Sequence, residues 1–501
     1  MILRMQSLKP TAVALTFLTF LIGSFLFYSP SLTPVKQTLP LQQYASPPQP
    51  SSTAVPSTTG WAVEMELLQY FEDYPLSSPH KNNFGELGRR TRLLRDLIVS
   101  ADREKKRPRK QALLSAVNRL AVLLYFFLQN SPQNPQSALP FSDLRASMVP
   151  KSAGIVIPAG DYNLRFAAHL ICCLRNVLKS KLPIQIVFAG DDDLSPTSRD
   201  FLTNLPNFVD HAPSLEFLDI TSVFNDTTLK MKEGGWAIKP FAALGSKYEK
   251  VIVMDADSVF LQKPEVLLHH PAFERTGAFL FHDRLLWQHG FQERHDWWRS
   301  QIKRPSATLD KSLVWKEDYA EEVDSGVVII DKSRIDVLVG LLHVCWQNSY
   351  EVREEVTYKM TYGDKESWWM GFELAGSTYE MEEHYGAIVG WEDTIVTDPA
   401  ARKVCSFVIA HLDDKNELLW YNGGLLKNKQ VPSMSHEYAV PDKWMVDAEW
   451  RKGATKPDMS CMVGGEVHNL PINLIGILES SIAEAKWVDE ALNITQSYQR
   501  K

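Results

Sequence analysis

Apolar residues recur with two different spacings along the chain, and the change of spacing predicts where helices give way to strands. From residue 61 to about residue 139, apolar positions recur every three or four residues, which is typical of amphipathic helices. Beyond this region short apolar runs alternate with helical stretches, so we expect strands at 154–158, 184–189, 215–220 and 251–254, and helices at 164–178 and 236–247. Strands separated by helices predict an α/β fold with a mainly parallel, doubly wound sheet.

The N-terminus carries a pattern of its own. Arg4 and Lys9 precede an uncharged apolar run over residues 11–28. As a helix this run would be about 27 Å long, close to the thickness of a thin bilayer. Bulky side chains continue up to Ser29-Pro30, unlike the exit of a cleaved signal peptide. Basic residues before the run predict a cytoplasmic tail, residues 1–10, and a translocated remainder. This is the layout of a single-pass type II membrane protein.

The rest of the chain divides by composition. Residues 29–60 are rich in Pro, Ser, Thr and Gln with almost no charge, so they cannot bury enough apolar surface to offset chain entropy. A flexible stem of this length reaches about 30 Å. Beyond it we expect a helical segment over 61–150, the α/β domain over 151–440 and a C-terminal extension over 441–501.

Composition and cysteine spacing narrow the classes of function. The chain is 45% hydrophobic with a formal net charge of -7, and no basic face stands out, which argues against nucleic acid as a partner. Its five cysteines show no metal-ligand spacing. The sequence is compatible with one or two disulfides. The sequons at Asn225 and Asn493 predict glycosylation sites if the domain is lumenal.

Two acidic turns follow predicted strands and are candidates for binding a divalent cation. Asp255 and Asp257 come directly after the apolar run Val251–Met254, and apolar residues also follow them. Asp191-Asp192-Asp193 lies in what reads as an exposed turn. Because a half-buried acidic pair needs a positive partner, and carboxylate oxygens suit hard cations, we favour Asp255 and Asp257 as the site. In open α/β sheets this edge is where ligands bind.

Several sequence blocks resemble the fungal mannan-type α-mannosyltransferases, glycosyltransferase family 71, which are Golgi type II enzymes. The likeness runs in order from about residue 150 to 430, and its blocks are Gly154–Pro158, Leu164–Ala167, Lys181–Gln185, Ala189–Leu194, Lys239–Ala242 and Asp255–Asp257. The resemblance implies a GT-A fold, GDP-mannose as donor, a mannose-containing glycan as acceptor, Mn2+ as cofactor and retention of anomeric configuration. It places the Asp-x-Asp motif on Asp255 and Asp257, and a third metal ligand on His411.

Further polar residues complete the predicted site. A cation that bridges the diphosphate stabilises the charge of the leaving group, and Lys239 could add a fixed positive charge. Asp324 and Gly326 begin a buried strand that could approach the donor. Asp364 and Glu366 are candidates for orienting the sugar or stabilising its oxocarbenium-like centre. Pro158 and Lys365 complete the predicted donor-binding residues.

The sequence is also compatible with other functions. A haloacid-dehalogenase-type phosphohydrolase would use Asp255 as nucleophile and Asp257 as general acid, but Trp368 stands where that class needs a late aspartate after Gly363-Asp364. A membrane-tethered glycan-binding protein would use the tryptophans without catalysis. Within the mannosyltransferases, α-1,3 linkage is favoured and α-1,2 is the alternative. Retention by a carboxylate nucleophile and by front-face attack are equally compatible with the sequence, and no nucleophile is assigned.

Overall fold

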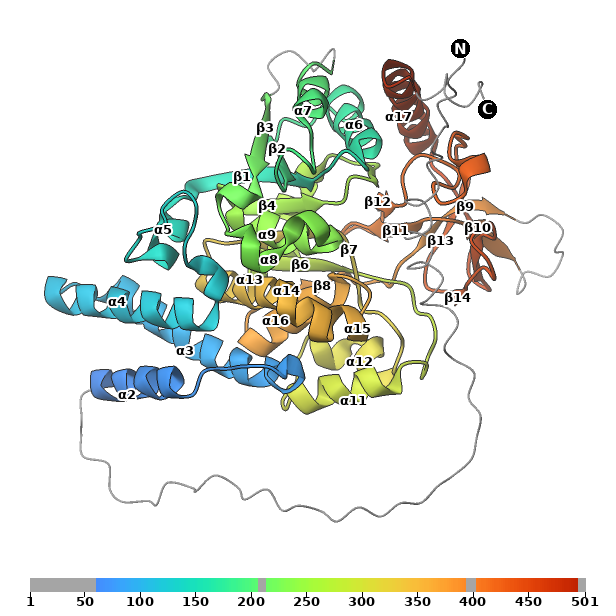
Figure 1. The fold of residues 1–501 in the computed structure, drawn as a ribbon. Helices are drawn as coiled ribbons and strands as arrows, with labels where there is room; N and C mark the ends of the chain where they lie inside the picture. Colours follow the sequence, from blue (N-terminus) through green and yellow to red (C-terminus); the bar gives the residue numbers. More distant parts are fainter. Residues whose placement is uncertain (1–59, 206–212, 393–401, 494–501) are drawn as a thin grey trace, which may run out of the picture. The chain divides into compact units, whose positions relative to one another are not determined.

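A seven-stranded sheet lies at the centre of the computed structural model, which describes residues 60–205, 213–392 and 402–493 (Figure 1). Across the sheet its strands are β3 (Leu215–Asp219), β2 (Ile184–Phe188), β1 (Val149–Pro158), β4 (Tyr248–Met254), β7 (Val323–Asp331), β6 (Ala278–His282) and β8 (Glu380–Met381). The neighbours β3, β2, β1 and β4 pair in parallel, whereas β7 is antiparallel to β4 and β6. The predicted α/β fold with a mixed and mainly parallel sheet is confirmed.

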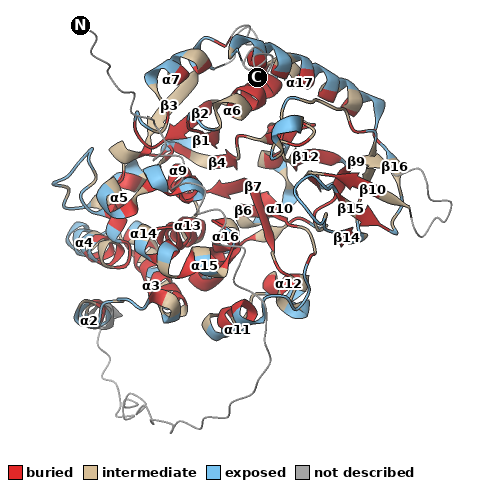
Figure 2. Ribbon diagram, turned by 45° about the vertical axis from the view of Figure 1, so that its right-hand side comes forward, coloured by how far each residue is buried: buried red, intermediate tan, exposed pale blue. Residues whose placement is uncertain are grey.

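Strands β2, β6 and β7 are buried along their whole length and β4 along most of it, so they bury side chains on both faces, which explains their continuous apolar runs. Along β4, Val251 and Val253 pack into one hydrophobic cluster, and Ile252 and Met254 pack into another. This alternation follows from the two-residue period of a strand. Figure 2 shows β7 buried along its length, as its burial pattern also records. Helices therefore have to cover both faces.

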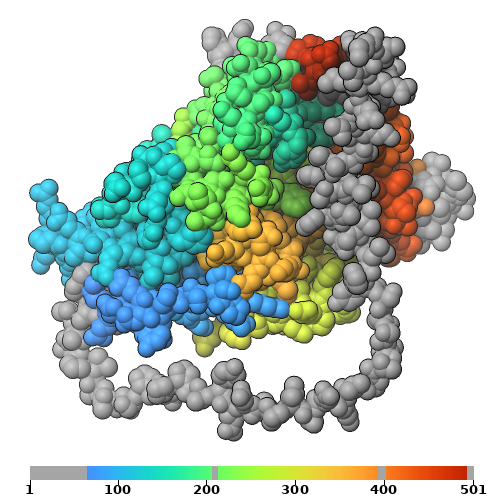
Figure 3. Space-filling model, in the orientation of Figure 1, coloured from blue at the N-terminus to red at the C-terminus, as the bar shows by residue number. Residues whose placement is uncertain are grey.

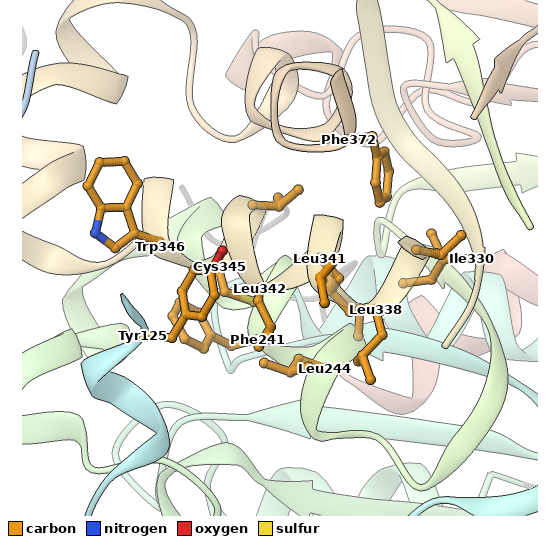
Figure 4. Close-up of a cluster of buried hydrophobic side chains, with 14 of the residues drawn as sticks. Tyr125, Phe241, Leu244, Ile330, Leu338, Leu341, Leu342, Cys345, Trp346 and Phe372 are labelled. Atoms are coloured by element: carbon orange, nitrogen blue, oxygen red, sulfur yellow. The ribbon is translucent and has the colours of Figure 1, made fainter. Parts of the chain in front are cut away.

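One face is covered by helices that are themselves apolar. α13 (Ile335–Gln347) is apolar on all sides and lies between α9 (Ile238–Gly245), α16 (Lys365–Ala375) and the sheet. Figure 4 shows Leu338, Leu341 and Leu342 of α13 among Phe241, Leu244 and Ile330, all fully buried.

The predicted N-terminal helical segment packs behind this layer. It consists of α2 (Gly60–Asp73), α3 (Phe84–Arg103) and α4 (Arg107–Leu124). α3 lies against α13 and α16, and Figure 3 shows the blue N-terminal helices directly against the orange part of the chain. At the crossing a Cβ on Gly88 would stand 2.4 Å from the carbonyl oxygen of Leu374, so only glycine permits this approach.

The C-terminal part extends the fold with two smaller sheets and a long helix. A three-stranded sheet consists of β11 (Ile409–Leu412), β12 (Leu418–Asn422) and β5 (Ser258–Phe260), in that order. A six-stranded sheet consists of β14 (Glu449–Arg451), β15 (Ser460–Val463), β10 (Lys403–Ser406), β9 (Ile388–Glu392), β13 (Lys443–Met445) and β16 (His468–Asn469). A disulfide between Cys405 and Cys461 joins β10 to β15. Strands from both sides of residue 440, the expected domain boundary, thus share one sheet.

The last helix returns to the first half of the molecule. α17 (Ile472–Ala491) packs against α6 (Leu164–Cys172), where Asp489 accepts hydrogen bonds from Arg165 at 2.7 Å and lies 2.9 Å from the His169 ring. Burial raises the pKa of the Asp489 carboxyl, but His169, Arg165 and Tyr438 outweigh it and hold the pKa below its usual range. A buried ion-pair network therefore joins α17 to α6.

The remaining elements are short and connect the layers. The other helices are α5 (Pro140–Ala146), α7 (Pro196–Thr203), α8 (Asp226–Leu229), α10 (Pro271–Thr276), α11 (Gln292–Gln301), α12 (Leu313–Glu317), α14 (Tyr350–Val352) and α15 (Tyr358–Met360).

The predicted membrane placement needs correction. No helix among residues 60–205, 213–392 and 402–493 is both long and apolar enough to cross a bilayer. This finding contradicts the expectation of a single-pass type II protein of the Golgi membrane. The apolar run 11–28, on which the expectation rested, lies outside the described residues, as does the predicted stem 29–60 up to residue 59.

Candidate functional site

A polar cavity of about 270 Å3 opens beside the carboxyl end of β4. Segments far apart in the sequence line it together: the turn after β4, the start of β7, the start of α16 and the loop after β12. Its lining residues are Trp236, Lys239, Asp255, Asp257, Arg284, Asp324, Ser325, Tyr362, Asp364, Lys365, Phe407, Ile409, Asn422, Gly423, Lys429, Gln430 and Lys452. Six predicted site residues thus meet at one place: Lys239, Asp255, Asp257, Asp324, Asp364 and Lys365.

The two aspartates of the motif lie in the short turn between β4 and β5. The Asp255 amide donates to the carbonyl of Gly326 at 2.7 Å, which fixes the turn against β7. Their side chains are 24% and 20% exposed, so both carboxylates are partly desolvated but reachable from the cavity. Burial raises the pKa of Asp255 to about 6 even though Lys239 opposes the shift. Both aspartates are accessible to a cation or another charged group in the cavity.

Lys239 connects the motif to the opposite wall. Its ammonium group is buried, 3.1 Å from Asp255 and 3.1 Å from Asp364, and donates to the Ser325 hydroxyl at 2.8 Å. Burial lowers the pKa of a lysine, but Asp255 and Asp364 outweigh burial and raise it, so the charge persists. α9 places this lysine, because Lys239 lies in its first turn.

Asp257 has a partner that the sequence did not identify. Lys429, on the loop after β12, contacts the Asp257 carboxylate. β12 pairs with β5 so that Asn422 stands opposite Ser258, and the Gly423 amide donates to the Asp257 carbonyl at 3.3 Å. Burial lowers the pKa of Lys429 to about 8. Its only sequence signal is the Asn-Gly-Gly turn after β12, and that turn does not indicate which carboxylate the lysine reaches.

His411 lies in β11, one residue before the strand ends at Leu412, and outside the cavity lining. Its Nδ1 is 2.8 Å from Glu382 and its Nε2 is 3.4 Å from Asp324, and its ring stacks on Trp420 at 4.3 Å. Burial lowers the pKa of His411, but Glu382 and Asp324 outweigh burial and raise it to about 9. The structure thus brings the ring to Asp324 and Glu382, and the metal-ligand role remains a prediction.

The carboxylate of Asp324 is held in place by several buried partners, His411 among them. It accepts hydrogen bonds from Asn422 Nδ2 at 2.9 Å and from the Gly326 amide at 2.9 Å. Burial raises its pKa, but His411 and Lys365 outweigh burial and hold the pKa below the usual range. The carboxylate therefore stays charged while 99% of the residue surface is covered, since Asp324 is 1% exposed.

Three consecutive titratable residues at the start of α16 point in different directions. Asp364 faces the cavity and accepts from Trp368 Nε1 at 2.8 Å, and Lys365 lines the cavity while contacting Asp283. Glu366 points away: it accepts from Trp369 Nε1 at 2.6 Å and from the Glu322 amide at 3.0 Å. Burial raises the pKa of Glu366 to about 8. Trp368 and Trp369 are both fully buried core residues.

The other predicted residues lie elsewhere. Pro158 is buried at the end of β1, outside the cavity lining. A Cβ on Gly326 would stand 3.0 Å from the Trp420 ring, so its lack of a side chain permits packing. Asn225 caps α8 by accepting from the Thr227 amide at 3.1 Å, and Asn493 is exposed; both remain predicted glycosylation sites.

The chemistry of the cavity suits a divalent cation only in part. Asp255 and Asp257 offer hard oxygen ligands and leave room for phosphate oxygens and water. In the part of the chain that the structure describes, no group of three or more His, Cys, Asp or Glu side chains could hold a metal ion. A cation held by Asp255 and Asp257 would therefore need its further ligands from substrate or water.

Comparison with known proteins adds the family. Residues 152–413 match the family model described as "Mannosyltransferase putative". Relatives from Saccharomyces cerevisiae include the alpha-1,3-mannosyltransferase MNN1, 24% identical over 60% of this chain and 43% of that protein. MNT2, another alpha-1,3-mannosyltransferase, is 25% identical over 72% of this chain and 66% of its own. The chain thus spans less than two thirds of the length of either relative.

Solved structures with some likeness include two glycosyltransferases. The galactosyltransferase LgtC, solved with donor and acceptor sugar analogues, is 14% identical, with a TM-score of 0.31 over 46% of this chain and 73% of that chain. The mannosyltransferase Ktr4p from S. cerevisiae is 10% identical, with a TM-score of 0.26 over 46% of this chain and 63% of that chain.

Proposed function

Because the chain belongs to the mannosyltransferase family that residues 152–413 match, we propose that it transfers mannose from GDP-mannose to a mannose-containing glycan. The observation that carries the proposal is the cavity beside β4, which is lined by four carboxylates and by several lysine and arginine side chains. α-1,3 is the favoured linkage, because the relatives in yeast are named alpha-1,3-mannosyltransferases. The reaction is proposed to retain the anomeric configuration.

Asp255 and Asp257 are proposed to hold a divalent cation, Mn2+, against the diphosphate. When bound, such a cation neutralises the charge that develops on the departing diphosphate. The chain supplies further positive charge on both sides: Lys239 contacts Asp255, and Lys429 contacts Asp257. Because a lysine that pairs with a carboxylate can also donate to a phosphate oxygen, both are proposed to bind the diphosphate directly.

Asp324 and Asp364 are proposed to bind the hydroxyls of the donor sugar. Each is 1% exposed yet lines the cavity, so the edges that they present there are held rigidly. For Asp324 the support comes from His411, which Glu382 in turn orients. His411 and Glu382 are therefore proposed as positioning residues. No group is proposed as a nucleophile.

The test is a coupled assay with the purified protein, GDP-mannose, Mn2+ and an α-mannoside acceptor. We expect acceptor-dependent release of GDP that Asp257→Ala abolishes, and a product whose linkage analysis gives a 1,3 bond. Phosphate release from simple phosphomonoesters, without use of GDP-mannose, would instead support a phosphohydrolase. Saturable binding of mannosides without any GDP release would support a glycan-binding protein. Either result would overturn the proposal.

A further inference from the structure

Two exposed aromatic side chains flank the mouth of the cavity, although neither belongs to the predicted site. Trp236 is 47% exposed and Tyr362 is 61% exposed, and both line the cavity. Their ring centroids are 5.3 Å apart, with the planes inclined by 47°. Large aromatic rings usually bury their surface, so a pair left open at a polar cavity provides an apolar face for a ligand.

The backbone under these rings is shaped to hold them. Gly363 adopts φ +65°, and a Cβ on it would stand 2.9 Å from the Trp236 ring. The indole therefore lies directly over the peptide backbone of residue 363, a contact that only glycine allows. Tyr362 packs beside it, and 47% of Trp236 stays exposed.

The two rings share their segments with the charged floor of the cavity. Trp236 precedes Lys239 by three residues, and Tyr362 precedes Asp364 by two. Lys239 and Asp364 form an ion pair of 3.1 Å between these segments and are 3% and 1% exposed. Each segment thus contributes one buried charge inside the cavity and one exposed ring at its mouth.

This arrangement separates the two substrates by depth. A donor sugar held by the buried carboxylates must turn its reacting carbon toward the solvent side, because the acceptor approaches from there. We propose that Trp236 and Tyr362 form an acceptor subsite, in which the apolar C–H face of a mannose ring stacks on the indole. Arg284 and Lys452 line the same cavity and offer donors for the acceptor hydroxyls. This subsite rests on the proposed function, which it deepens.

The experiment measures binding apart from catalysis. Calorimetric titration of α-1,2-mannobiose into the protein with GDP and Mn2+ gives an acceptor affinity, and GDP-mannose is titrated separately. We expect Trp236→Ala and Tyr362→Ala to weaken mannobiose binding about 10-fold, more than they weaken donor binding, because a stacked ring is removed. Trp236→Phe, which keeps a ring, should restore most of the affinity.

Trp287→Ala is the matched control, since Trp287 is 50% exposed but lies outside the cavity lining. It should bind mannobiose within twofold of the unmodified protein. The subsite is overturned if the unmodified protein does not bind mannobiose, if Trp236→Ala binds it as before, or if that variant loses donor affinity instead. Failure of the proposed function has a separate signature: GDP-mannose is not turned over, whereas mannobiose binding still responds to Trp236→Ala.

Discussion

Two acidic turns stand at the carboxyl ends of parallel strands in the same sheet, and only one of them lines the cavity. After β2, Asp191 and Asp192 are 71% and 90% exposed and pair with Arg199 and Lys232 at the surface. After β4, Asp255 and Asp257 are 24% and 20% exposed and meet lysines inside the cavity. Carboxylates in similar places in the topology thus differ in solvation and in partners. The comparison shows that the environment of an acidic motif determines its chemistry more than its amino-acid sequence does.

The largest effect should follow the loss of a cavity carboxylate. Asp257→Ala should lower acceptor-dependent GDP release at least about 100-fold, because a charge that acts on the diphosphate is removed and Lys429 loses its partner. Initial rates at saturating donor measure the effect, and circular dichroism checks that the fold is retained. Retention of more than half the activity would contradict the assigned difference between the turns.

A smaller loss is expected at the lysine opposite Asp257. Lys429→Met keeps the length of the side chain but removes its charge, and should reduce kcat/KM for GDP-mannose by about 10- to 100-fold. Lys427→Met is the control on the same loop, because Lys427 pairs with Glu437 at 3.1 Å instead. Steady-state kinetics with varied donor compares the two variants. Equal effects would show that the loop, and not the charge at Asp257, matters.

Asp364 and Glu366 also differ, because Asp364 lines the cavity and Glu366 is buried away from it. The pH dependence of stability tests the burial of Glu366. Burial raises the folded-state pKa of Glu366 to about 8 from 4.5, so the native state retains a proton that the unfolded state releases. Between those pH values this group lowers the free energy of unfolding as pH rises, by at most about 1.4 kcal/mol per unit. Glu366→Gln should remove this slope in urea unfolding curves. Parallel pH profiles for the two proteins would contradict the assignment.

The smallest effect is expected at the surface turn. Asp191→Asn and Asp192→Asn each break an exposed ion pair, which typically contributes less than about 1 kcal/mol. GDP release should stay within twofold of the unmodified protein, and the melting temperature should barely change. A loss comparable to that of Asp257→Ala would remove the distinction between the turns.

The fold and part of the site were predictable because their signals are local. The alternation of apolar runs located β1 to β4 and the helical stretches at 164–178 and 236–247, but not α7 or α8. The apolar residues around Asp255 and Asp257 marked that pair as half-buried. The partners of these residues depend on pairing between distant segments. Lys429 reaches Asp257 only because β12 pairs with β5, and Glu382 meets His411 only through tertiary packing.

Side-chain direction was equally hidden from the sequence. Asp364 and Glu366 are two residues apart, yet one lines the cavity and the other turns toward the indole of Trp369. On a helix such a spacing places side chains about 200° apart, but the face that looks at the cavity is set by packing. The sequence did not mark Trp236 and Tyr362 as site residues, because the exposure of an aromatic ring depends on the tertiary structure.

The position of α17 has a consequence for how this protein can be cut and recombined. The match to the family model ends at residue 413, before β12, before Lys429 and before the helix whose Asp489 pairs with Arg165. A chain terminated there would expose the edge of β5 and the apolar surface of α6 that α17 covers. The segment matched by the family model is thus shorter than the folded unit, and a chimera between relatives should exchange everything through residue 493.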